Sequence, residues 1–106
     1  MNSTPSPVLS SSSPADRGPR FSLGQIVATP AVLAHLNTHG VTPLSLLRRH
    51  IMGDWGEVGA EDRAENELAL VHGFRLLSRY TVAGKPIWII TEADRSVTTL
   101  LFPSEY

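Results

Sequence analysis

Cysteine is absent from this chain of 106 residues, which excludes disulfide bonds and zinc sites with thiolate ligands. Long apolar runs are also absent: stretches such as Ile87–Ile90 are far shorter than the roughly 20 residues that span a bilayer. The N-terminal stretch lacks the basic and apolar regions of a secretory signal. These absences predict a cytoplasmic protein without a membrane segment, and the length leaves room for one domain.

Lysine is nearly absent too. Lys85 is the only lysine, and the other basic residues are arginines, whose planar side chains suit carboxylate or phosphate recognition but also follow genomic base composition. The formal net charge is −1, so no overall attraction to nucleic acid is expected. The chain has no GxxxxGK[ST], GxGxxG, GxSxG or HExxH motif, and we therefore predict no cofactor.

The composition changes near Phe21. Residues 1–20 are dominated by Ser, Thr and Pro and have almost nothing to bury, which predicts a disordered tail. Residues 21–106 are predicted to form a single α+β domain.

Three helices are predicted, over residues 30–38, 43–52 and 60–72. Thr29-Pro30 and Thr42-Pro43 each combine a threonine N-cap with proline at the first helical position. Gly73 is expected to end the third helix. The residues expected to face the core are Val32, Leu33 and Leu36; then Leu44, Leu47 and Ile51; then Leu68, Leu70 and Val71.

After Gly73 the hydrophobic period changes to two, which predicts strands over residues 74–82, 86–91 and 96–102. Phe74, Leu76, Ser78, Tyr80 and Val82 are expected on one face of the first strand. The apolar run of the second strand favours a central position. The short connections predict an antiparallel β-meander on which the three N-terminal helices pack.

The first candidate site lies at the end of the second helix. His50 and Asp54 are four residues apart and could share a helix face, as an imidazole and the carboxylate that orients it. Arg48 and Arg49 could bind a phosphate, beside Trp55. The structural alternative is that cations at a helix C-terminus stabilise the helix dipole, that Trp55 covers the core, and that Asp54 begins a turn through an Asx motif.

A second group is acidic and lies between Asp54 and Glu67. Glu61 and Glu65 are one helical turn apart, but no Asp/Asn/Gly-rich calcium loop accompanies them. A solvated helix face is the stronger interpretation, and no metal site is predicted.

The third candidate site is the polar turn after the second strand, which contains Glu92, Asp94 and Arg95. Turn chemistry accounts for most such residues. Turn chemistry does not explain Thr98 and Thr99, which lie in the third strand. Alternation along a strand places one of their hydroxyls on each face of the sheet, and a buried hydroxyl needs a hydrogen-bond partner. Arg75 and Arg79 share the outward parity of their strand, and could form an anion-binding face or be solvated.

Two resemblances bear on function. The segments RRHIMGDWG, RLLSRY and IWIITEADRSVTTLLFPSEY, with the Glu61-Asp62 pair, resemble a family of small proteins carried on bacterial conjugative plasmids and integrative elements. Its members are often labelled plasmid-related protein or type I restriction subunit. This chain lacks the glycine-rich loop and the NPP[FY] motif that a methyltransferase subunit needs.

The order of helices and strands also resembles the barnase–EndoU–colicin–RelE group of ribonucleases. That resemblance implies RNA cleavage without a metal by His50, Arg75 or Arg79, Tyr80, and Thr98 or Thr99.

Two hypotheses of function follow. In the first, the chain is an interaction or regulatory module that acts on a host or plasmid system through an unknown protein partner, with the acidic 54–67 segment as contact. In the second, it is a metal-independent ribonuclease that uses His50 and a strand threonine. The first fits the slightly negative charge and the mobile-element resemblance.

Overall fold

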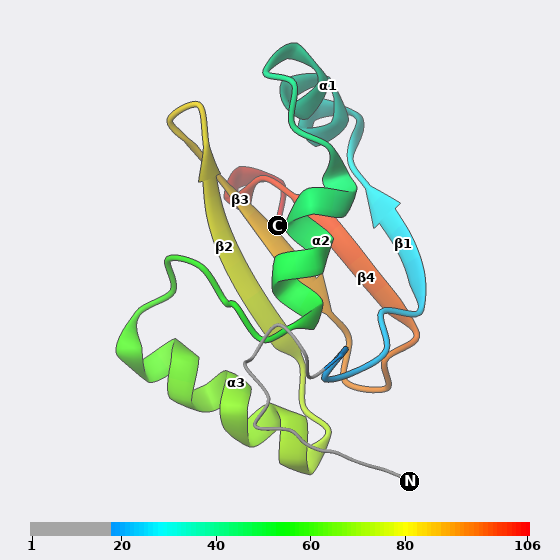
Figure 1. The fold of residues 1–106 in the computed structure, drawn as a ribbon, viewed down its shortest axis with the longest axis vertical. Helices are drawn as coiled ribbons and strands as arrows, with labels where there is room; N and C mark the ends of the chain where they lie inside the picture. Colours follow the sequence, from blue (N-terminus) through cyan, green and yellow to red (C-terminus); the bar gives the residue numbers. More distant parts are fainter. Residues whose placement is uncertain (1–17) are drawn as a thin grey trace, which may run out of the picture.

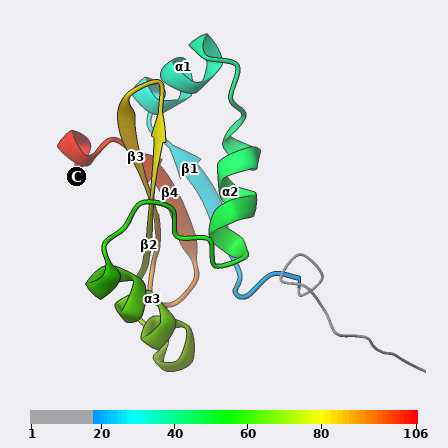
Figure 2. The same cartoon turned by 60° about the vertical axis from the view of Figure 1, so that its left-hand side comes forward.

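Four strands form one mixed sheet, in the order β1-β4-β3-β2, in a computed structural model that describes residues 18–106. The elements in chain order are β1 (Gln25–Ala28), α1 (Pro30–Thr38), α2 (Pro43–Ile51), α3 (Ala60–His72), β2 (Leu76–Val82), β3 (Lys85–Thr91), β4 (Val97–Leu101) and the 3-10 helix η3 (Pro103–Glu105). Helix α2 lies along one face of the sheet, and α1 and α3 lie near opposite ends of the molecule (Figure 1). Turned by 60°, the molecule has η3 on the other side of the sheet from α2 (Figure 2).

The predicted α+β class is confirmed, but two finer expectations are wrong. The sheet has four strands rather than three, and it is mixed, because β1 pairs in parallel with β4. Strand β1 also precedes the helices, so the helices are not all N-terminal to the sheet. Its four residues, QIVA, show no alternation by which a strand could be recognised, and the partner of Gln25 is Val97, near the other end of the chain. The other three strands form the expected antiparallel meander, with β3 in the interior.

The predicted disordered tail falls almost entirely on residues 1–17, which lie outside the described residues. Arg20 already belongs to the fold: its backbone N–H donates to the carbonyl of Ile51, and its guanidinium binds Glu67.

Local signals placed the helices well. Thr29 and Thr42 cap α1 and α2, and accept hydrogen bonds from the backbone N–H groups of Val32 and Ser45. Gly73 ends α3 with a left-handed φ of 74°. The tight turn between β2 and β3 uses positive φ at both Ala83 and Gly84, as a two-residue hairpin of type I′ requires.

The main core lies between the sheet and the first two helices. Its buried members are Val32, Leu36, Leu46, Leu47, Tyr80, Val82, Ile87, Ile89 and Leu100. A second buried cluster, beneath α3, consists of Trp55, Val58, Ala69 and Leu76.

Several residues that were expected in the core are exposed instead, namely Leu33, Leu44, Leu68, Val71 and Phe74. In α2 the buried residues are Leu46, Leu47 and His50. The apolar pattern did not include His50, because histidine is polar. In α3 the buried residues are Asn66 and Ala69, and Leu70 packs against the second cluster as expected, whereas Leu68 and Val71 are directed to solvent.

Candidate functional site: a buried histidine network and an exposed helix face

His50 lies in the last turn of α2 and has no solvent exposure. Its ring is packed edge-on against Phe21 and Trp55, at centroid distances of 5.1 and 5.9 Å. Both ring nitrogens point to strand hydroxyls: Nδ1 is 2.6 Å from Ser78 Oγ, and Nε2 is 2.9 Å from Thr91 Oγ1. The imidazole therefore connects α2 to β2 and β3 through the core.

The network continues from Thr91 across the sheet. Thr91 Oγ1 lies 2.7 Å from Thr98 Oγ1 on β4, and Thr98 donates to the carbonyl of Leu23 over 2.7 Å. A carbonyl only accepts, so the single hydroxyl proton of Thr98 goes to Leu23, and that of Thr91 must then go to Thr98. His50 must donate from Nε2 to Thr91 and accept at Nδ1 from Ser78. One neutral tautomer satisfies every member of the network.

Burial holds the pKa of His50 down at about 3, and the positive charge of Arg95 adds to the effect. The ring is thus neutral at physiological pH. Because both nitrogens are already bonded inside the protein, His50 would have to give up a network bond before it could take a proton from a substrate.

Asp54 does not pair with His50, and the expected imidazole–carboxylate pair is wrong. Asp54 Oδ2 instead accepts from Arg49 Nε at 2.8 Å, and this bond is the main reason why the pKa of Asp54 is lowered. Its Oδ1 accepts from the N–H of Gly56, so the predicted Asx turn is confirmed. The guanidinium of Arg49 lies 4.4 Å from the Tyr80 ring centroid, and Tyr80 donates its hydroxyl to the Asp54 carbonyl. Burial raises the pKa of Tyr80.

Trp55 is buried in the second core cluster, with its indole N–H donating to Glu67 Oε2 at 2.9 Å. Glu67 also binds Arg20, and these two contacts lower the pKa of Glu67. Trp55 therefore serves packing, and Arg48, on the exposed side of α2, has no hydrogen-bond partner among residues 18–106.

The strand threonines separate as the alternation predicts. Thr98 is buried in the His50 network, whereas Thr99 is on the other face of the sheet, in register with Ile90 and Val27. Arg79 shares that other face, cross-strand from Trp88, and Arg75 bonds the Tyr106 hydroxyl. The sheet thus lies between His50 and the two arginines, so Arg75 and Arg79 do not form one site with His50.

The polar turn is used to hold the fold together. Arg95, at a positive φ of 62°, donates to the carbonyls of Phe74 and Ala69 and so secures the C-terminal end of α3. Asp94 accepts from the backbone and side chain of Ser96, which lowers the pKa of Asp94. Glu92 is exposed, and its backbone pairs with Val97 and Arg95. These contacts assign the three candidate residues to turn structure.

Sequence reasoning brought His50 and Thr98 forward but missed Ser78 and Thr91 as members of the same network. The available signal was a hydroxyl at an inward position: Ser78 lies between Leu76 and Tyr80 on the core side of β2. Thr91 was predicted as the last residue of the second strand, but no partner was expected for its hydroxyl. Among the described residues no group of three or more His, Asp or Glu side chains could hold a metal ion.

The most unusual surface lies on α3. The α3 outward face, as we call it, consists of Ala60, Ala64, Leu68 and Val71, all exposed and spaced so that they lie along one side of the helix. Leu68 and Val71 are 56% and 77% exposed. The acidic residues Glu61 and Glu65 run beside them, whereas Asp54, Glu57 and Glu67 of the predicted acidic segment are bonded within the fold.

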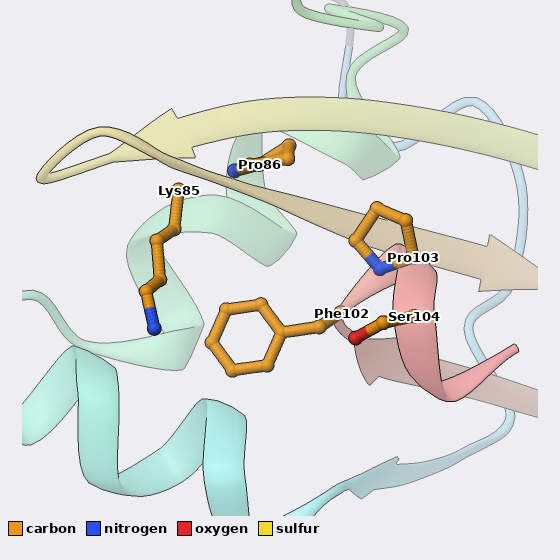
Figure 3. A pocket seen from close by; sticks show the side chains of 5 residues that line it. All are labelled: Lys85, Pro86, Phe102, Pro103 and Ser104. Atoms are coloured by element: carbon orange, nitrogen blue, oxygen red, sulfur yellow. The ribbon is translucent and has the colours of Figure 1, made fainter.

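An open cleft of about 340 Å³ lies between the start of β3 and η3 (Figure 3). Its lining consists of Lys85, Pro86, Phe102, Pro103 and Ser104. The ammonium of Lys85 is 5.4 Å from the Phe102 ring centroid, so the one charged group of the lining is already held against an aromatic face. The cleft holds no pair of groups that could act as acid and base.

No protein-family model matches the chain, and no curated protein or solved structure does either. In the part of the chain that the structure describes, none of the helices is both long and apolar enough to cross a membrane.

Proposed function

We propose that this protein is an interaction module rather than an enzyme, and that the α3 outward face is its contact surface. The observation that carries the proposal is the exposure of Leu68 and Val71 on the outer side of α3. Clustered aliphatic side chains on the surface of a small domain mark binding sites more often than chance, because each loses favourable burial when left in water. The exposed acids Glu61 and Glu65 agree with the acidic segment that was expected to form the contact.

The His50 network supports the same proposal, because it argues against a catalytic role for His50. The residue with the strongest catalytic pattern in the sequence has no solvent exposure and no free ring nitrogen. Such a network fits a structural role that fixes α2 on the sheet. The resemblance to plasmid and integrative-element proteins makes a host or plasmid protein system the target of the module.

Capture from a lysate of the source organism tests the contact surface. Tagged wild-type chain and the Val71→Glu variant are used as parallel baits, and retained proteins are quantified by mass spectrometry. We expect proteins that the wild type retains and Val71→Glu loses. Leu44→Glu is the matched control, since Leu44 is also an exposed aliphatic residue but lies on α2. Equal retention by wild type and Val71→Glu would contradict the proposal.

The ribonuclease alternative draws on one observation, the short path from His50 through Thr91 to Thr98. It requires the buried site to open to substrate. The test is incubation of generic RNA with purified protein in EDTA: cleavage by wild type that His50→Gln abolishes, with both proteins folded by circular dichroism, would favour the alternative over the interaction module. No cleavage by wild type would exclude it.

A further inference from the structure

From the shape and charge of the α3 outward face, we infer that its occupant is α3 of a second copy of this chain, packed antiparallel. This inference rests on the proposed function and names the partner. Its starting point is the distribution of side-chain size along the face, with Ala60 and Ala64 in the first half of α3 and Leu68 and Val71 in the second half.

Size complementarity favours the antiparallel arrangement. The spacings of four and three residues from Ala64 through Leu68 to Val71 are those of a coiled-coil seam, in which side chains of one helix fill gaps on the other. When two copies of α3 run in opposite directions about a twofold axis that crosses the outward face at the level of Asn66, Ala64 faces Leu68 of the second copy and Ala60 faces Val71. Each large side chain then meets a small one. A parallel pair would instead set Val71 against Val71 and leave a gap between the alanines.

The helix dipoles and the polar side chains lead to the same orientation. Glu61 is in the first turn of α3, and His72 is in the last turn on the same side of the helix. The antiparallel pair brings Glu61 beside His72 of the second copy, and the two helix dipoles oppose each other. Glu65 lies near the twofold axis and meets its own copy there, which weakens the pair at low salt.

The expected dimer is weak. Helix α3 is 13 residues long, or about 20 Å, so a pair of such helices buries less than the roughly 1,200 Å² of a standard stable interface. A contact of this size suits reversible association in the micromolar-to-millimolar range rather than a permanent dimer.

Sedimentation equilibrium of the full chain, from about 10 μM to about 1 mM, tests the inference. We expect the average mass of the wild type to rise from the 11.5 kDa monomer toward twice that value. Val71→Glu and Ala64→Glu should remain monomeric at every concentration, and the control Leu44→Glu should follow the wild type. Glu65→Gln should dimerise more tightly than wild type at low salt. A wild type that stays at the monomer mass throughout overturns the inference.

Cysteine cross-linking tests the orientation of the two helices. Because the chain has no natural cysteine, each introduced cysteine can form a disulfide only with another introduced one. Ala60→Cys and Val71→Cys are prepared separately and oxidised alone or mixed. The antiparallel pair predicts a disulfide dimer only in the mixture, because two copies of position 60 lie about 18 Å apart, too far for a disulfide. Disulfide dimers of Ala60→Cys alone or of Val71→Cys alone, with no disulfide between positions 60 and 71 in the mixture, would overturn the antiparallel arrangement.

The two proposals fail separately. If the wild type is monomeric but lysate capture still depends on Val71, the second copy is the wrong occupant and the interaction module stands. If Val71→Glu changes neither mass nor capture, both proposals fail.

Discussion

Lowering the pH should destabilise this protein through His50 before its carboxylates are protonated. The pKa of His50 is about 3 in the fold, against about 6.5 in an unfolded chain. Between these values the unfolded state binds a proton that the folded state rejects. The neutral ring therefore imposes no penalty above pH 6.5, and the free energy of unfolding falls as the pH decreases below that value.

The magnitude follows from linkage. Each pH unit below 6.5 removes about 1.4 kcal/mol until the folded pKa is reached, so moving from pH 7.5 to pH 5 should cost about 2 kcal/mol. That loss is a large fraction of the 5–15 kcal/mol by which domains of ordinary size are stable. The lowered pKa values of Asp54 and Glu67 act in the same direction, but only from about pH 5 downward, where these groups begin to titrate in the unfolded chain.

Urea denaturation at pH 7.5, 6.5, 5.5 and 5, followed by tryptophan fluorescence, measures the effect, since Trp55 packs against His50 in the core. The control is His50→Gln, which can still donate to Thr91 but does not titrate. At pH 7.5 the wild type should be more stable by about 1–3 kcal/mol, because the variant leaves Ser78 without its acceptor. At pH 5 that advantage should shrink by about 2 kcal/mol. If both proteins lose the same free energy between pH 7.5 and pH 5, the argument for a buried neutral histidine is refuted.

Three further predictions concern the contacts around the network, and each is read from urea denaturation at pH 7.5. Thr98→Val should lower the free energy of unfolding by about 1–3 kcal/mol, because the Leu23 carbonyl and the Thr91 hydroxyl lose their partner; Thr98→Ser should lose less, and equal losses would show that packing rather than the hydroxyl matters. Gly56→Ala should cost about 1–3 kcal/mol or more, since φ is 75° and the added Cβ would meet the Arg79 carbonyl oxygen, whereas Gly59→Ala has open space and should cost less, about 1 kcal/mol or under, from the change at the N-cap of α3; similar values for the two variants would contradict the close approach. Asn66→Ala should cost about 2–4 kcal/mol, because the side chain bonds both the N–H and the C=O of Leu77 at the edge of β2; an effect as small as that of Glu65→Ala would show that water replaces these bonds.

Features that depend on neighbouring residues could be predicted from the sequence. The threonine–proline caps, the glycine that ends α3 and the alternation in β2 each depend on a few adjacent positions, and all were placed correctly. Strand β1 could not be found in this way, since the strand it pairs with among residues 18–106 is β4, at the far end of the chain. The same limit applies to the His50 network, which joins residues from β2, β3, β4 and the segment before β1.

The candidate site shows the limit most clearly at Asp54. The sequence placed it four residues after His50, which on a continuous helix would put the two side chains together. Helix α2 ends at Ile51, so the backbone turns away and Asp54 meets Arg49 instead. Because the helix ends before Asp54, the four-residue spacing did not bring its carboxylate to His50, and the candidate catalytic pair is instead a surface ion pair of Asp54 with Arg49.

The helix α3 was predicted correctly, but two of the side chains expected to face the core, Leu68 and Val71, are exposed. The reason bears on function. Amphipathic patterning assumes that aliphatic residues of a helix face the core of the same chain. Helix α3 packs Ala69 and part of Leu70 against the second cluster, and polar contacts also hold it to the fold, with Asn66 bonded to Leu77, Glu67 to Trp55 and Arg95 to the carbonyl of Ala69. Because these contacts anchor the helix, Leu68 and Val71 are not needed by the core of one chain. An apolar stripe that one copy does not bury fits best the surface of another molecule, and its graded side-chain sizes make a second α3 the best match.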